Sequence, residues 1–166
     1  MLLEKMTDSG RIVFVSSGTH DPAKKSTVAV PVYENARLLA YPKEMSQNEN
    51  MLTVGQRRYS TSKLCNIYCT YELAERIKQQ TNKNINYIFA SLQPNVNTPD
   101  KSGKTLASLV TNPELNETTG KYFDGTREIK SSKLSYNKKN REDLWKTSVE
   151  LSKLNKTEAI LTLDKE

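Results

Sequence analysis

The sequence predicts an α/β fold with a parallel sheet, on the evidence of three segments in the order strand, helix, strand. Residues 11–18 are a short apolar run that ends in small polar residues, the pattern of a central strand covered on both faces. Residues 59–80 carry apolar side chains three and four positions apart, which predicts one buried helix face. A second apolar run at 85–90 predicts another strand. This order makes a crossover unit, whose two strands lie parallel.

The segment between the first strand and the helix, residues 20–58, is predicted to be a long inserted loop. Prolines interrupt it and residues 46–50 are wholly polar, so we expect only one short helix, at 34–39. A loop of this length in a compact domain is usually functional or mobile. Its place beside the first strand suggests a lid over a substrate.

Signals are weaker in the last third of the chain. We expect a helix at 104–111, a last strand or extended arm at 120–123, and a terminal helix at 141–154. Residues 155–166 are expected to fray. The sequence has no internal repeat, so residues 1–154 are interpreted as a single domain, with residues 59–80 as its main helix.

Composition excludes several classes of protein. No apolar run approaches the roughly 20 residues that span a bilayer, and the N-terminus is charged too early for a secretory signal, so we predict a cytoplasmic protein. The 25 basic residues are interleaved with 19 acidic ones, for a net charge of +6. The densest basic stretch, 130–141, is interpreted as a solvated loop and not as a nucleic-acid site.

The few metal-ligating side chains do not favour a metal site. Cys65 and Cys69 are the only cysteines, and His20 is the only histidine and lies far from them. A structural zinc site takes four such ligands. We therefore expect no metal, and two reduced thiols on one helix face.

A candidate catalytic group opens the main helix. Tyr59 and Lys63 stand four positions apart, so their side chains lie on one face. A free phenol has a pKa of about 10, and a nearby ammonium lowers it toward the range of a useful proton donor. Ser17 follows the first strand, where its hydroxyl can hold a substrate oxygen at the carboxyl end of the sheet. Tyr-x-x-x-Lys alone is common on solvated surfaces, so the surrounding order of strands and helix carries the interpretation.

That order resembles the short-chain dehydrogenase/reductase superfamily. Residues 11–17 (RIVFVSS) and 59–66 (YSTSKLCN) are most similar to its branch of retinol dehydrogenases and protochlorophyllide reductases. The resemblance covers essentially the whole chain and corresponds to the C-terminal half of the family domain. It implies an α/β Rossmann-like parallel sheet with flanking helices, incomplete because the first half is missing.

The resemblance also implies a role for each catalytic residue. Ser17 would polarise a substrate carbonyl, and Tyr59 would be the acid/base. Lys63 would lower the pKa of Tyr59 and, together with it, bind the nicotinamide ribose. The cofactor that the branch implies is NADP, with NAD left open.

A segment after the second strand adds cofactor contacts by the same resemblance. Residues 92–98 are similar to the family segment that approaches the nicotinamide, and the matching positions are Pro94, Val96 and Thr98. Asn95 stands where the family has glycine. Asparagine adopts positive φ more readily than most residues, so the turn is still accessible.

Other features depart from the family. The six glycines form no glycine-rich turn that could hold a pyrophosphate, and Tyr59 lies 42 positions after Ser17, far beyond the usual spacing. The family's N-terminal half would precede Met1. The first strand is then expected at a sheet edge, to be covered by a homodimer partner or by that missing half.

Two functions remain open from the sequence. The first is an oxidoreductase that transfers hydride between NADP(H) and a small carbonyl or alcohol substrate. The second is a truncated, non-catalytic fragment or interaction module that lacks cofactor binding. The sequence does not identify the substrate.

Overall fold

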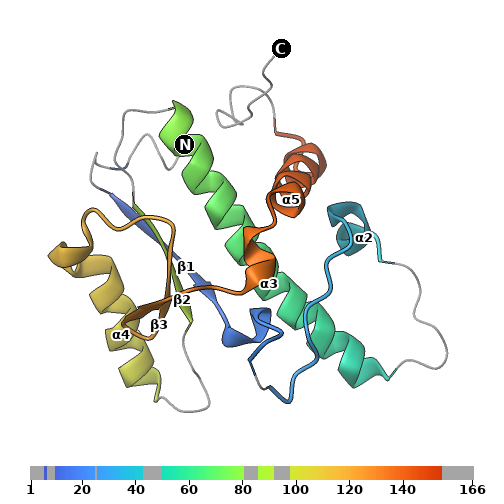
Figure 1. Cartoon of the computed structure of the whole chain (residues 1–166), viewed down its shortest axis with the longest axis horizontal. Coiled ribbons are helices and arrows are strands. Elements are labelled where there is room, and N and C mark those ends of the chain that lie inside the picture. Colours follow the sequence, from blue (N-terminus) through green and yellow to red (C-terminus); the bar gives the residue numbers. More distant parts are fainter. Residues whose placement is uncertain are drawn as a thin grey trace.

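The computed structural model describes residues 6, 10–24, 26–42, 50–80, 86–91 and 98–154. The elements are β1 (Arg11–Ser16), the 3-10 helix η1 (Gly18–His20), α2 (Ala36–Ala40), α3 (Met51–Gln80), β2 (Asn86–Ser91), α4 (Pro99–Thr111), η2 (Pro113–Leu115), β3 (Lys121–Asp124), β4 (Arg127–Ile129), η3 (Lys133–Tyr136) and α5 (Lys138–Leu151). Figure 1 shows the sheet between α4 on one side and α3 on the other. The predicted frayed tail lies outside the described residues.

The described strands form one sheet in the order β1-β2-β3-β4. β1 and β2 pair in parallel, with Arg11 opposite Asn86 and Ser16 opposite Ser91. β3 pairs in parallel with β2, whereas β4 pairs antiparallel with β3. β1 therefore lies at one edge of the sheet and β4 at the other.

The predicted fold class, an α/β Rossmann-like parallel sheet with flanking helices, is wrong for the described chain. The sheet is mixed, and its strands have only six, six, four and three residues, whereas α3 alone has 30. The parallel order ends at Asp124-Gly125, where Gly125 adopts φ +64° and the chain reverses into β4. An Asp-Gly pair is a hairpin signal, but the three residues of β4 are too few to show a strand pattern. The run at 11–18 has the apolar pattern of a central strand, but β1 lies at an edge of the described sheet, as we expected from the missing first half of the family domain.

The main helix begins earlier than predicted. α3 starts at Met51 rather than at Tyr59, so the end of the predicted loop is helical. The Asn50 side chain accepts hydrogen bonds from the backbone N–H groups of Leu52 (2.8 Å) and Thr53 (3.4 Å), which stabilises the first turn. This capping signal lay hidden in a wholly polar run. Of the rest of the loop, α2 corresponds to the short helix expected at 34–39.

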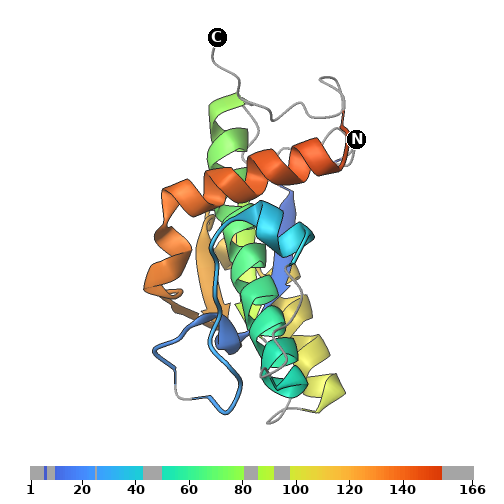
Figure 2. The same ribbon diagram turned by 90° about the vertical axis from the view of Figure 1, so that its right-hand side faces the viewer.

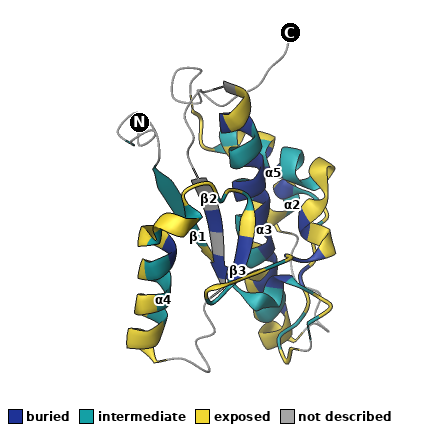
Figure 3. Ribbon diagram, turned by 60° about the vertical axis from the view of Figure 1, so that its left-hand side comes forward, coloured by how far each residue is buried: buried dark blue, intermediate teal, exposed yellow. Residues whose placement is uncertain are grey.

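The predicted apolar face of α3 is confirmed. Its buried members are Leu64, Ile67, Tyr68, Tyr71 and Ile77. Figure 3 shows this buried stripe between α3 and its neighbours. The burial of large apolar side chains along one stripe is what holds α3 against the sheet and α5.

Apolar clusters lie on both faces of the sheet. On the α3 face, Ile67 and Tyr71 pack with Tyr122 of β3 and Phe14 of β1. On the α4 face, Leu109 packs with strand residues including Ile88, Ala90 and Phe123. A further cluster lies on the side of α3 away from the sheet, where Ala36, Leu64, Tyr68 and Leu144 join α2, α3 and α5. Figure 2 shows α5 and α2 lying across α3.

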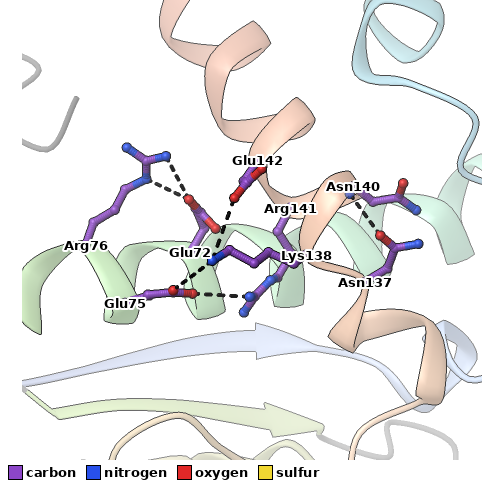
Figure 4. Close-up of polar contacts among 8 residues, drawn as sticks. All are labelled: Glu72, Glu75, Arg76, Asn137, Lys138, Asn140, Arg141 and Glu142. Carbon is purple, nitrogen blue, oxygen red and sulfur yellow. Dashed lines mark hydrogen bonds and ion pairs between the residues drawn. The ribbon is translucent and has the colours of Figure 1, made fainter. Parts of the chain in front are cut away.

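Ion pairs connect α3 and α5 in addition to this packing (Figure 4). Glu75 accepts from Lys138 at 3.4 Å and from Arg141 at 3.2 Å. The basic stretch 130–141, interpreted from the sequence as a solvated loop, therefore includes η3 and the first turn of α5. Two of its cations join α5 to α3. No helix among the described residues is long and apolar enough to span a membrane.

Candidate functional site

Two serines at the carboxyl end of β1 begin the candidate site. Ser16 is buried, and its hydroxyl donates a hydrogen bond to the backbone oxygen of Lys63 at 2.9 Å. Asn66, three positions further along α3, donates from its side-chain amide to the Val15 carbonyl at 3.2 Å. These two bonds fix the end of the strand against the turn of α3 that carries Lys63.

Ser17 is half-buried and caps the 3-10 helix η1. Its hydroxyl oxygen accepts from the backbone N–H of Thr19 at 3.4 Å and from the Thr19 hydroxyl at 3.2 Å. A serine hydroxyl has one donor and two acceptor positions. Both contacts use the acceptor side, so the hydroxyl hydrogen retains the capacity to donate to a substrate oxygen.

Tyr59 and Lys63 lie one helical turn apart on the same side of α3. The Lys63 ammonium is 5.3 Å from the centre of the Tyr59 ring, within the range of a cation–π contact. Tyr59 is 46% exposed and Lys63 is half-buried. The phenol is therefore accessible from solvent, next to a positive charge, in the part of α3 that is joined to the end of β1.

The residues expected around the nicotinamide are less informative. Pro94 and Val96 lie outside the described residues. Thr98 is exposed and caps α4, where its hydroxyl accepts from the backbone N–H of Lys101 at 3.3 Å. The hydroxyl predicted to approach a cofactor thus has a structural role at a helix N-terminus.

The described residues fit only one end of a dinucleotide. Tyr59 carries a hydroxyl and Lys63 an ammonium, which are groups that can hydrogen-bond the hydroxyls of a ribose. Tight phosphate turns use glycine where a Cβ would collide with a neighbour, but a Cβ built at Gly55 or Gly103 meets nothing within 4 Å. At Gly18 it would make only an ordinary contact, 3.6 Å from Nζ of Lys24. These positions supply no pyrophosphate cradle.

His20 is a site residue that the sequence did not reveal. It is fully buried, and its Nε2 accepts from the backbone N–H of Ser132 at 3.1 Å. Nδ1 must then carry the proton, which it donates to the Ser17 carbonyl at 2.6 Å. Burial lowers the pKa of His20, so the neutral ring is favoured. The ring also packs edge-on against Tyr122, with centroids 5.0 Å apart.

His20 thereby holds the backbone next to the candidate serine. It contacts no substrate-accessible space, so its role is to position Ser17. A single histidine without periodic neighbours gives no sequence signal for this role, because its partner Ser132 lies 112 positions away. Asn66, by contrast, could have been found, since it continues the helical stripe of Tyr59 and Lys63 at the next i+3 position.

The two cysteines are free thiols in the α2–α3–α5 region. Burial raises the pKa of Cys65 to about 12 and that of Cys69 to about 11. Both thiols stay protonated near neutral pH, which makes them poor nucleophiles. Within the described part of the chain, no three His, Cys, Asp or Glu side chains gather as metal ligands would.

The comparisons with known proteins identify a shared fold and nothing finer. No protein-family model matches the chain, and no curated protein matches it. The chain is similar to the crystal structure of an uncharacterized protein from Mycobacterium paratuberculosis, with a TM-score of 0.57 and 18% sequence identity. The similarity covers 88% of this chain but 51% of that one, so this chain spans about half the length of that protein.

Proposed function

We propose that the chain carries the proton-transfer site of an oxidoreductase of the short-chain dehydrogenase/reductase type. The observation that carries this proposal is the stripe on α3, where the Lys63 ammonium lies over the accessible Tyr59 phenol. The bond from Ser16 to the Lys63 backbone holds this stripe against the strand end that bears Ser17. In this proposal the Ser17 hydroxyl, the Tyr59 phenol and the Lys63 amine act together beyond the carboxyl end of β1.

The three side chains divide the reaction between them. Ser17 donates a hydrogen bond to the substrate carbonyl oxygen, which polarises the carbon. Tyr59 delivers its proton to that oxygen during reduction and takes it back during alcohol oxidation. The Lys63 ammonium favours the phenolate that forms when the proton leaves. NADPH, when bound, supplies the hydride that the carbonyl carbon receives.

The described residues account for only part of a cofactor site. Tyr59 and Lys63 would hold the ribose in this proposal, and Gly18, Gly55 and Gly103 offer no pyrophosphate cradle. The preference for NADP over NAD and the cytoplasmic location are part of this proposal and rest on the resemblance and the sequence alone. The substrate is a small carbonyl or alcohol compound of a class not narrowed further.

A partner strand at β1 forms part of the proposal. β1 is an edge strand, and Val15 on it is 40% exposed. An edge strand has unpaired backbone N–H and C=O groups, so it pairs readily with a further strand. In this proposal either a second copy of the chain or a separate N-terminal half covers this edge.

A second function is favoured by the same open edge. In this alternative, the chain is a non-catalytic fragment or interaction module that keeps the Ser-Tyr-Lys pattern by descent. The edge of β1 would then be a protein-binding surface, and no cofactor would bind. The two functions differ in cofactor binding, which is directly measurable.

Titration of the purified chain with NADPH and with NADH tests the proposal, with thermal unfolding and nucleotide fluorescence as readouts. Binding to the native state raises the unfolding temperature with ligand concentration. Saturable binding supports the oxidoreductase site. No binding up to millimolar nucleotide, by the chain alone and after mixing with a candidate N-terminal half, rejects it in favour of the interaction module.

Two substitutions locate the chemistry once binding is seen. Tyr59→Phe should leave nucleotide affinity nearly unchanged and lower turnover by about 10²- to 10⁴-fold, because it removes the proton donor and little surface. Lys63→Ala should lower both the nucleotide affinity and the turnover. Tyr41→Phe is the matched control, since Tyr41 is 64% exposed and lies far from α3's Tyr-Lys stripe in sequence. Retained turnover in Tyr59→Phe would refute the role of the phenol.

A further inference from the structure

A cavity of about 500 Å³ lies on the side of α3 that faces away from the sheet. It is lined by residues of α2, α3 and α5 and by Pro42, two positions after α2. Cavities of roughly 300 to 1,000 Å³ are the size that small organic ligands occupy.

The frame of this cavity is held in place by polar contacts. Asp143 of α5 accepts from the Tyr33 hydroxyl at 2.7 Å and from the backbone N–H of Ala36, the first residue of α2, at 2.8 Å. Arg37 of α2 also pairs with Glu150 of α5. The short helix α2 is therefore fixed on α5, and the cavity between them is formed before any ligand arrives.

The lining is mostly apolar. Leu38 and Leu39 of α2 and Leu144 and Leu151 of α5 line the cavity, and the protonated thiol of Cys65 adds an apolar surface from α3. Leu39 remains 39% exposed. An alkyl chain that covers this exposed apolar surface removes it from water, and this makes binding favourable.

One end of the cavity carries a cation. A second cavity of about 250 Å³ shares Leu38, Leu39, Pro42, Arg58 and Thr61 with the first, so the two adjoin at these residues. Arg58 is exposed and forms no ion pair with any carboxylate among the described residues. Arg57 and Glu34 line the smaller cavity among the described residues, so Arg58 is the cation that the two cavities share.

We propose that the cavity between α2, α3 and α5 binds an amphipathic small molecule with an alkyl chain and a carboxylate head group. The alkyl chain lies among the leucines of α2 and α5. The head group lies at Arg58, whose planar guanidinium suits a carboxylate. Ser17, Tyr59 and Lys63 line neither of these two cavities, and Asn66 is the one residue of the candidate site that also lines the larger cavity.

Calorimetric titration of the full chain with decanoate, kept below its micelle concentration, tests the proposal against decanol. Decanoate should bind saturably at one site. Decanol should bind about 10- to 100-fold more weakly, because it lacks the charged hydrogen bonds to Arg58. Absence of saturable decanoate binding overturns the proposal, and so does equal affinity for the two compounds.

Two variants and their controls locate the site. Arg58→Gln should lower decanoate affinity to that of decanol and leave decanol unaffected. Ala40 is an exposed residue of α2 that lines the cavity. Ala40→Phe should lower the affinity for both decanoate and decanol, because the larger side chain fills the space. Arg127→Gln and Ala107→Phe are matched controls at exposed positions on β4 and α4. Decanoate affinity that is unchanged in Arg58→Gln, or lowered equally in a control, contradicts the assignment.

Two further measurements distinguish other occupants of the cavity. Light scattering of the unliganded chain that shows a dimer broken by Ala40→Phe would mean that a second copy covers this face, against the proposal. Binding to phosphatidylcholine vesicles without binding to free decanoate would mean a membrane surface, also against it. Tyr59→Phe should leave decanoate affinity unchanged, so failure of the proposed oxidoreductase function does not affect this result.

Discussion

Two stripes of α3 contrast sharply. The buried stripe packs against the sheet on one face and α5 on the other, and the helix beside it includes an ion pair between Glu72 and Arg76, whose side chains are 5% and 7% exposed. The exposed stripe carries Tyr59 at 46% exposure and Lys63, with a ring contact between them. The comparison teaches that the interactions that stabilise the fold and the residues of the candidate site lie on different stripes of one helix. Substitutions on the two stripes should therefore have separable effects.

The largest expected effect comes from breaking the buried ion pair. Arg76 donates to Glu72 at 2.8 Å and lies 5.0 Å from the centre of the Trp145 ring (Figure 4 shows the pair). Glu72→Ala removes the buried carboxylate that pairs with Arg76, so we expect a loss of about 3–5 kcal/mol in the free energy of unfolding. Urea denaturation of the variant measures it.

The exposed pair of Asp100 and Lys104 on α4 provides the control for this substitution. Its side chains are 74% and 78% exposed. Asp100→Ala should change stability by no more than about 0.5 kcal/mol, because solvent screens exposed i,i+4 pairs. Equal losses in the two variants would show that burial does not set the strength of the Glu72 interaction.

A smaller, pH-dependent effect is expected at His20. Its pKa in the folded state is lowered from 6.5 by burial, so the unfolded chain binds the proton more readily. The stabilising contribution of the neutral ring is full above pH 6.5 and is lost as pH falls through the lower folded-state pKa. Unfolding free energies measured from pH 8 down to pH 5 should decline in that window.

His20→Phe separates the pH dependence that arises from His20 from the pH dependence that arises from carboxylates. The variant keeps a ring against Tyr122 but leaves the Ser132 N–H without its acceptor, at a cost of about 1–3 kcal/mol at pH 7.5. The decline below pH 6.5 should become shallower, since the chain has only one histidine. An unchanged pH profile would mean that the decline arises elsewhere.

The smallest stability effects are expected on the exposed stripe. Tyr59→Phe keeps the ring under Lys63 and should change the free energy of unfolding by less than about 0.5 kcal/mol. Lys63→Ala removes the ring contact and should lose about 0.5–1 kcal/mol. Thermal unfolding of both variants checks this. A loss above 2 kcal/mol in Tyr59→Phe would erase the distinction between the two stripes.

Much of the local structure could be predicted from sequence. The buried face of α3, from Leu64 to Ile77, follows from apolar residues at helical spacing. The strand at Lys121–Asp124 and the terminal helix were also expected, within a few residues of their observed bounds. The helix start was missed because its capping residue, Asn50, stands in a polar run where no apolar period marks a beginning.

The candidate site was predictable only in part. Tyr59 and Lys63 share a side of α3, as their spacing requires, because a separation of four residues is fixed by helix geometry alone. The hydrogen bond from Ser16 to the Lys63 backbone joins residues 47 positions apart, and no sequence pattern predicts it. The place of Thr98 at a helix cap was likewise hidden, since a threonine before proline and aspartate also fits a loop.

The sequence by itself determined the main helix, the two parallel strands β1 and β2, and which side chains of the helix share a face, because these depend on neighbours within one or two turns. Tertiary structure alone decided that β4 reverses the sheet direction, that His20 holds the Ser17 backbone, and that three helices line a cavity. Each of these depends on contacts between residues distant in the chain. Such contacts depend on packing and hydrogen-bond geometry in three dimensions, and no local periodicity in the sequence indicates them.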